Sequence, residues 1–207
     1  MKTTLLKIDI LYTWTSDGLR LQGIHYEPEV RDLGVLFIHG MSGNFIENYF
    51  APILGKTLAE AGIGFIYGHN RGHSHINDTA TKEVKEEVGF KTTRQGVMYE
   101  RFEDCIYDIE SWLDEYRKLG YKRFVVIGHS LGCNKVVYYF ERRKPKDVVG
   151  IILASPPDLV GLARLPKYQP NYDEMLAEAK KNIAAKQPRK LLSSLLWNWH
   201  TLSSQTF

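Results

Sequence analysis

A serine between two glycines has the surroundings that point most directly to chemistry. Ser130 lies in the run GHSLG (128–132), which follows the apolar run RFVVI (123–127) and opens the run LGCNKVVYYFERR (131–143). A serine on a tight turn between a strand and a helix exposes its hydroxyl, and flanking glycines let the two elements approach closely. The pattern therefore predicts that Ser130 is a nucleophile.

The start of the following helix would stabilise negative charge beside that serine. Free backbone N–H groups and the positive end of the helix dipole favour a developing oxyanion, so we expect the Leu131 N–H to be one donor. A second apolar strand ends in His39-Gly40-Met41, where glycine would let the chain turn and aim the Met41 N–H at the same oxyanion. We expect His39, Gly40 and His129 to border the substrate, with His39 also organising its loop.

Each motif also has a purely structural interpretation. G-x-S-x-G patterns occur by chance, and Ser130 would then act only as a helix N-cap. The residues after 35–38 could form an ordinary glycine-containing turn. The strand–turn–helix context of Ser130 favours the catalytic interpretation.

Short apolar runs predict the elements that position these residues. Uninterrupted apolar stretches bounded by glycine, proline or charge are typical of strands buried on both faces of a parallel sheet, and they occur at 34–38, 64–67, 123–127 and 148–153. Helical patterns lie between them at 49–61, 102–119 and 131–143. This alternation predicts an α/β fold with a mostly parallel, doubly wound sheet.

The rest of the chain is predicted to form an edge hairpin, a long loop and a cap. An Asp17-Gly18 turn between β-rich segments predicts an antiparallel hairpin over 5–26. The polar residues 69–100 are typical of a long loop with one short helix near 83–87. Prolines punctuate the chain after Leu153, before a predicted helix at 172–185. We therefore divide the chain into an α/β core (1–154) and a helical cap (155–207).

Three motifs together resemble the α/β-hydrolase family. They are the His39-Gly40 loop, the run NRGHS (70–74) after the next strand, and GHSLG (128–132). The family commonly has an aspartate where this sequence has His69, and a second glycine that is absent here. The resemblance covers residues 19 to 160. It implies a serine hydrolase that forms an acyl-enzyme with a small-molecule ester or thioester and needs no metal or organic cofactor.

The resemblance also implies an acid and then a histidine after the serine. Beyond Leu153 we predict no further buried strand, so we interpret the chain as a hydrolase without the C-terminal part that carries this pair. Within the sequence, Asp158 is the candidate acid and His200 the candidate base, since no other histidine follows Ser130. Their alternative interpretations are a turn or capping aspartate and a cap-packing histidine. The competing function is a catalytically incomplete hydrolase or a non-catalytic binding protein.

Composition narrows the expected partners. The chain has 27 basic and 24 acidic residues, with a net charge of +3, and lacks the clustered basic excess of nucleic-acid binders. It contains no run of about 20 apolar residues that could span a membrane and no signal-peptide pattern. Cys105 and Cys133 form no redox or metal-ligand motif, so we expect a cytoplasmic protein.

Two further expectations concern metals and assembly. His69, His73 and His75 could form a metal cluster, but no acidic or cysteine ligand joins them at short spacing, so we favour a polar loop near the active-site mouth. A sheet without its last strands would expose an apolar edge, so self-association into a homo-oligomer is also expected.

Overall fold

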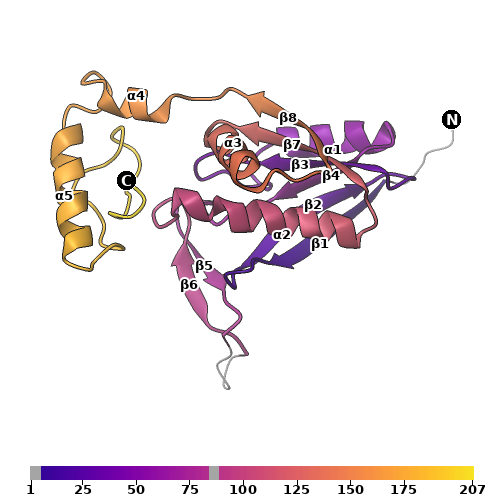
Figure 1. The fold of residues 1–207 in the computed structure, drawn as a ribbon, viewed down its shortest axis with the longest axis horizontal. Helices are drawn as coiled ribbons and strands as arrows, with labels where there is room; N and C mark the ends of the chain where they lie inside the picture. The colour runs from indigo at the N-terminus through magenta and orange to yellow at the C-terminus, as the bar shows by residue number, and fades with distance from the viewer. Residues whose placement is uncertain (1–5, 84–88) are drawn as a thin grey trace.

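The computed structural model describes residues 6–83 and 89–207, which fold around a six-stranded sheet (Figure 1). The strands, in spatial order, are β1 (Lys7–Trp14), β2 (Arg20–Glu27), β4 (Gly64–Gly68), β3 (Leu33–Ile38), β7 (Arg123–His129) and β8 (Val148–Ala154). Strands β4, β3, β7 and β8 run parallel, whereas β1 and β2 add an antiparallel edge. The predicted α/β fold with a mostly parallel sheet is confirmed.

The edge hairpin turns where the sequence predicts it. The Thr15 N–H donates to the Leu19 carbonyl at 2.8 Å, which closes the turn between β1 and β2. Gly18 has a φ of 95°, a conformation that glycine adopts without the steric cost of a side chain. The Asp17-Gly18 pair therefore works as the predicted hairpin signal.

Helices cover both faces of the sheet (Figure 1). Helix α1 (Phe50–Glu60) packs in a cluster with Val35 and Phe65. Helices α2 (Cys105–Lys118) and α3 (Leu131–Arg143) lie on the other face, where Trp112 and Tyr139 are fully buried. This arrangement is the expected doubly wound sheet, in which the central strands β3 and β4 are apolar because both of their faces are covered.

The segment predicted as a long loop contains a second, small sheet. Strands β5 (Asn77–Ala80) and β6 (Thr92–Gln95) pair antiparallel and project from the main body (Figure 1). The prediction missed them because their residues are polar and show no apolar alternation, which leaves backbone pairing as their main stabilisation. The short helix predicted near 83–87 lies largely outside the described residues.

The chain beyond β8 adds helices and loops to the fold. Helices α4 (Leu159–Arg164) and α5 (Tyr172–Ala184) follow, the second of them as predicted. The prediction missed α4, a short helix between prolines, and the helix predicted at 102–119 is divided into the one-turn 3₁₀ helix η1 (Phe102–Asp104) and α2. Met41 packs against an apolar cluster of this C-terminal region that includes Met175 and Leu196. The region therefore contacts the loop after β3, and the division at 154/155 stays a prediction.

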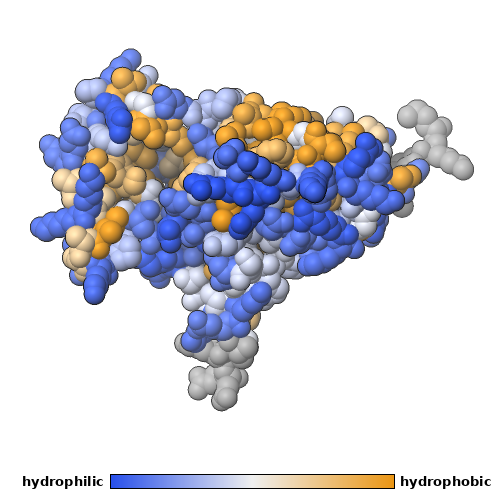
Figure 2. Space-filling view, in the orientation of Figure 1, coloured by the Kyte–Doolittle hydropathy of each residue, from blue (hydrophilic) through white to orange (hydrophobic). Residues whose placement is uncertain are grey.

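Strand β8 leaves one edge of the main sheet open in the described part of the chain. It pairs with β7 on one side, and Val149 and Ile152 are 58% and 51% exposed. The prediction that the run at 148–153 is buried on both faces is therefore wrong in the described part of the chain, because no element there covers the outer side of β8. Figure 2 shows apolar surface in this area. The open edge is the feature that motivated the expectation of a homo-oligomer, which stays a prediction. None of the helices in the described residues has the length and apolarity needed to cross a membrane.

Candidate active site

Ser130 occupies a strained turn between β7 and α3. Its backbone has φ 53° and ψ −127°, a conformation that costs a non-glycine residue about 1–3 kcal/mol. The Ser130 N–H donates to the Ala154 carbonyl at 3.0 Å, and the Cys133 N–H donates to the Ser130 carbonyl at 2.8 Å. The Cys133 thiol also donates to the Ala154 carbonyl at 3.2 Å. Bonds to β8 and α3 therefore hold the serine in its strained conformation.

The two glycines of the motif are required by close backbone packing. A Cβ atom at Gly132 would lie 2.2 Å from the Ile38 carbonyl oxygen, and one at Gly128 would lie 2.5 Å from the Gly132 carbonyl oxygen. Both distances are far below van der Waals contact and involve backbone atoms that cannot rotate away. The glycines let α3 start directly against β3 and β7, as the sequence predicts.

The strained turn makes a testable prediction about stability. We expect Ser130→Gly to raise the free energy of unfolding by about 1 kcal/mol, because relief of about 1–3 kcal/mol of strain is partly offset by the greater unfolded-state entropy of glycine. Ser130→Ala keeps the strain and serves as the control, with an expected change below about 0.5 kcal/mol. Urea unfolding followed by circular dichroism measures both. A glycine variant no more stable than the alanine variant would contradict the prediction.

The loop after β3 passes directly beside the Ser130 side chain. A Cβ atom at Gly40 would lie 2.8 Å from the Ser130 Cβ atom and 3.2 Å from its Oγ atom. Met41 and Leu131 line one cavity next to this contact. The Met41 N–H donates to no acceptor in the described chain, and the Leu131 N–H opens a helix and has no intrahelical acceptor. The structure thus places the two residues that the sequence singled out at one cavity.

His39 holds the loop in this position. The Asn70 N–H donates to His39 Nε2 at 3.0 Å, so Nδ1 carries the proton and donates to the Gly40 carbonyl at 2.8 Å. Burial, with a smaller effect of nearby Lys135, lowers the pKa of His39 well below its usual value, so the ring is neutral. The imidazole therefore organises the loop as predicted. Neither ring nitrogen is left to bind a substrate, which corrects the expectation that the His39 side chain borders one.

A buried ion pair that the sequence did not predict supports the loops after β3 and β4. Lys135 Nζ lies 2.6 Å from Glu100 Oε2 and donates to Asn70 Oδ1 at 3.2 Å. The Lys135 and Glu100 side chains are 1% and 5% exposed. A Cβ atom at Gly72 would overlap the Glu100 carboxylate. The one available signal was a lysine on the core-facing side of the helix after Ser130.

The two candidate partners for the serine lie in different surroundings. Asp158 caps α4, where its Oδ1 accepts from the Gly161 N–H at 2.8 Å. His200 stacks on Trp199 and lies 5.5 Å from His75 between ring centroids. Within the described chain, no side chain forms a hydrogen bond with Ser130 Oγ or joins Asp158 to a histidine. The capping interpretation of Asp158 is thus what the contacts show, and the acid and base roles stay predictions.

The other histidines near the site form an aromatic layer. His69 and His73 stack with ring centroids 4.1 Å apart, and His129 lies 5.7 Å from Phe50. Burial lowers the pKa of His69 to about 3 and that of His73 to about 4, so both are neutral at pH 7. The stacked rings fit the polar-loop interpretation, and within the described residues His69, His73 and His75 do not place three ligand atoms close enough together to hold a metal ion.

One other group of described residues could offer ligand atoms to a metal. Asp9, His25 and Glu27 place one ligand atom each within 4.8 Å of one another, on the β1–β2 hairpin. Lys7 Nζ already lies 3.2 Å from the Asp9 carboxylate and 2.6 Å from the Glu27 carboxylate. A metal would have to displace this ammonium group, so the ion pairs account for the cluster.

The cavity beside the two backbone donors is mostly apolar and has a volume of about 250 Å³. Its core side is formed by Met41, Glu100, Phe102 and Leu131, and the C-terminal region supplies the rest. The lining residues from that region are Leu159, Val160, Ala163, Tyr172, Leu196, Trp197, Thr206 and Phe207. An apolar cavity of this size can accommodate a small acyl group.

This arrangement of strand, serine turn and helix agrees with a family comparison. The model of the α/β-hydrolase fold family matches residues 35–204 of the chain. The chain belongs to the α/β-hydrolase family. The match includes all three α/β-hydrolase motifs that the sequence analysis singled out.

Solved α/β-hydrolase structures share the fold at low sequence identity. An esterase of Pyrococcus furiosus has a TM-score of 0.55 and 16% identity, over 87% of this chain and 57% of that one. The α/β hydrolase GrgF of a Penicillium species has a TM-score of 0.63 and 16% identity, over 87% of this chain and 55% of that one. A thermostable carboxyl esterase of Bacillus coagulans has a TM-score of 0.56 and 14% identity, over 89% of this chain and 53% of that one. This chain therefore spans just over half the length of these α/β-hydrolases. No curated protein sequence matches it.

Proposed function

We propose that the protein hydrolyses carboxylic esters or thioesters through an acyl-enzyme on Ser130. Ser130 Oγ attacks the carbonyl carbon, and the Met41 and Leu131 N–H groups hold the oxyanion of the tetrahedral intermediate. The alcohol or thiol leaves with a proton, and water then attacks the acyl-enzyme to release the acid. The observation that carries this proposal is a strained serine beside two free backbone donors at an apolar cavity.

The reaction also needs a base to take the Ser130 proton. We propose a histidine for this step, as in other serine hydrolases, with His200 as the candidate within the sequence and Asp158 as the candidate acid. In the described residues His200 makes no hydrogen bond to Ser130 Oγ, so this role requires the C-terminal region to move. The related solved structures are longer than this chain, which is compatible with a base outside it.

A non-catalytic binding protein is the second candidate function. The missing hydrogen bond to Ser130 Oγ in the described residues favours it, because a serine without a base keeps only a small part of its reactivity. Such a protein would still bind an acyl compound in the apolar cavity, with its carbonyl oxygen at the Met41 and Leu131 N–H groups.

Active-site labelling distinguishes the two functions. We expect a fluorophosphonate probe to add one adduct to the folded chain at Ser130, detected by intact mass and peptide mapping, and the chain to release p-nitrophenol from p-nitrophenyl butyrate. Ser130→Ala should abolish both signals, and Ser155→Ala, which removes another serine with positive φ, should retain them. Turnover that persists in Ser130→Ala would refute the assignment. A folded wild type with no adduct and no turnover would favour the binding protein.

A further inference from the structure

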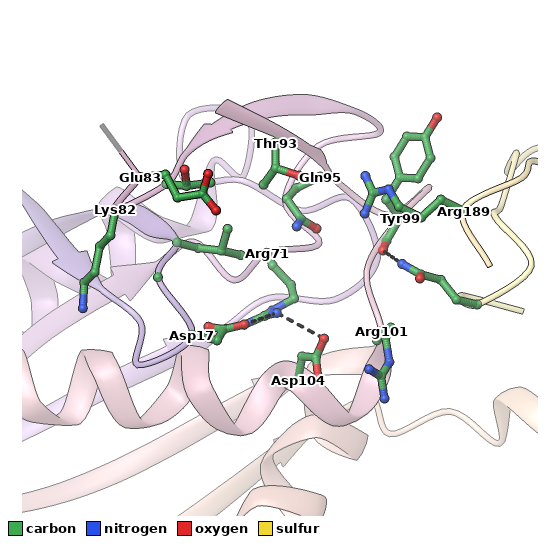
Figure 3. A pocket seen from close by; sticks show the side chains of 14 residues that line it. Asp17, Arg71, Lys82, Glu83, Thr93, Gln95, Tyr99, Arg101, Asp104 and Arg189 are labelled. Atoms are coloured by element: carbon green, nitrogen blue, oxygen red, sulfur yellow. Dashed lines mark hydrogen bonds and ion pairs between the residues drawn. The ribbon is translucent and has the colours of Figure 1, made fainter. Parts of the chain in front are cut away.

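A second cavity lies at the base of the β5–β6 hairpin and is strongly polar. Its volume is about 470 Å³, and it shares no lining residue with the cavity beside Ser130. Figure 3 shows its walls, which come from the β1–β2 turn, the hairpin, the segment before α2 and the C-terminal region. The proposed esterase reaction makes no use of this cavity.

Carboxylates outnumber the guanidinium group around Arg71, and two of these carboxylates, Asp17 and Asp104, line the cavity. Arg71 Nη1 lies 2.9 Å from Asp17 Oδ2 and 3.2 Å from Asp104 Oδ2, and Arg71 Nη2 lies 2.9 Å from Asp108 Oδ1. One guanidinium thus faces three carboxylates. Burial raises the pKa of Asp104, although Arg71 and Arg101 act in the opposite direction. A cation or another hydrogen-bond donor that entered the cavity would stabilise this excess of carboxylates.

A buried acceptor in the same cavity has no partner. Gln95 is 8% exposed, and its Oε1 atom receives no hydrogen bond within the described chain. Its amide points into the cavity towards Arg71 (Figure 3). The five Arg71 N–H groups are directed at Asp17, Asp104 and Asp108, so Arg71 leaves no donor for Gln95. A buried acceptor without a donor is costly, so a donor group on a ligand would stabilise it.

Positive charge lies at a different part of the same cavity. Arg101 is exposed and forms no ion pair in the described chain. The Arg189 guanidinium lies over the Tyr99 ring at 4.6 Å from its centroid and donates to the Arg94 carbonyl, which occupies only part of its donor set. Both arginines lie on the side of the cavity near Tyr99 (Figure 3). Lys82 and Glu83 at the opposite side add opposite charges.

We propose that this cavity binds a free amino acid or a similar small zwitterion. Its ammonium group would donate to Asp17, Asp104 and Gln95 Oε1, and its carboxylate would accept from Arg101 and Arg189. A zwitterion satisfies both charged regions, whereas a simple amine or carboxylate satisfies one. The volume leaves room for an amino-acid side chain of moderate size.

Isothermal titration calorimetry on the full chain tests this site with L-norvaline and L-glutamine, at up to about 10 mM to detect dissociation constants near 1 mM. n-Butylamine and pentanoate, which each lack one charged group of norvaline, are the matched control ligands. We expect at least one amino acid to bind saturably. Both control ligands should bind at least about tenfold more weakly than that amino acid. A folded chain that binds neither amino acid, or binds butylamine or pentanoate equally well, would overturn the proposal.

Two variants connect the binding to the residues named. Gln95→Leu removes the unpaired acceptor, so we expect about tenfold weaker amino-acid binding together with a melting temperature that is unchanged or higher. Arg101→Gln should weaken binding to a similar extent, while the exposed Arg143→Gln on α3 should leave it unchanged. Unaltered affinity in both Gln95→Leu and Arg101→Gln would place the ligand elsewhere and refute the site.

Discussion

We expect Lys135→Met to lower the free energy of unfolding by about 3–5 kcal/mol, because removal of one partner leaves the buried Glu100 carboxylate without its counter-charge. Glu100 Oε2 lies 2.6 Å from Lys135 Nζ, and both side chains are almost completely buried. Methionine has a similar length and fills the same space. The loss of stability therefore measures the effect of the missing charge and not that of a new cavity. Urea unfolding monitored by circular dichroism gives the value.

The double variant Lys135→Met/Glu100→Leu is the control for this interpretation. Replacement of both charges by apolar groups removes the uncompensated carboxylate, so most of the stability should return, apart from the lost hydrogen bond to Asn70. A single variant that loses less than about 1 kcal/mol would show that solvent reaches Glu100 and that the pair is not buried in solution.

The second large effect is expected for Gly132→Ala. The new Cβ atom would lie 2.2 Å from the Ile38 carbonyl oxygen and 2.8 Å from the His39 carbonyl oxygen, so α3 must move away from β3. Overpacking of this kind costs about 1–3 kcal/mol of stability. The same movement separates the Leu131 and Met41 N–H groups, so we also expect the rate of fluorophosphonate labelling at Ser130 to fall about 100-fold or more.

Gly150→Ala is the matched control in the neighbouring strand. A Cβ atom there would meet only Val125 Cγ2, at 3.9 Å, which is an ordinary van der Waals contact. We expect Gly150→Ala to change the stability by less than about 0.5 kcal/mol and the labelling rate not at all. Equal labelling rates in the two glycine variants would contradict the geometry described for the serine turn.

Local patterns predicted the parts of the fold whose causes are local. The apolar run at 34–38 became a buried parallel strand, since a strand covered on both faces has no position for a polar side chain. The runs at 123–127 and 148–153 also became parallel strands, but each keeps partly exposed positions. The sequence did not predict β5 and β6, because that hairpin buries little apolar surface and its residues show no alternation of apolar and polar side chains. An aspartate after prolines is typical of a turn or helix cap, and the contacts of α4 agree with this role for Asp158.

The sequence by itself determined the sheet class, the serine turn and the two loops that meet beside it, because glycine spacing and apolar runs constrain the backbone over a few residues. Only the tertiary structure decided which side chains pair across the fold. Lys135 and Glu100 are 35 residues apart, and Asp17, Arg71 and Asp104 come from three separate segments. Such pairs depend on the distance between elements after packing, and that distance cannot be predicted from the residue types alone.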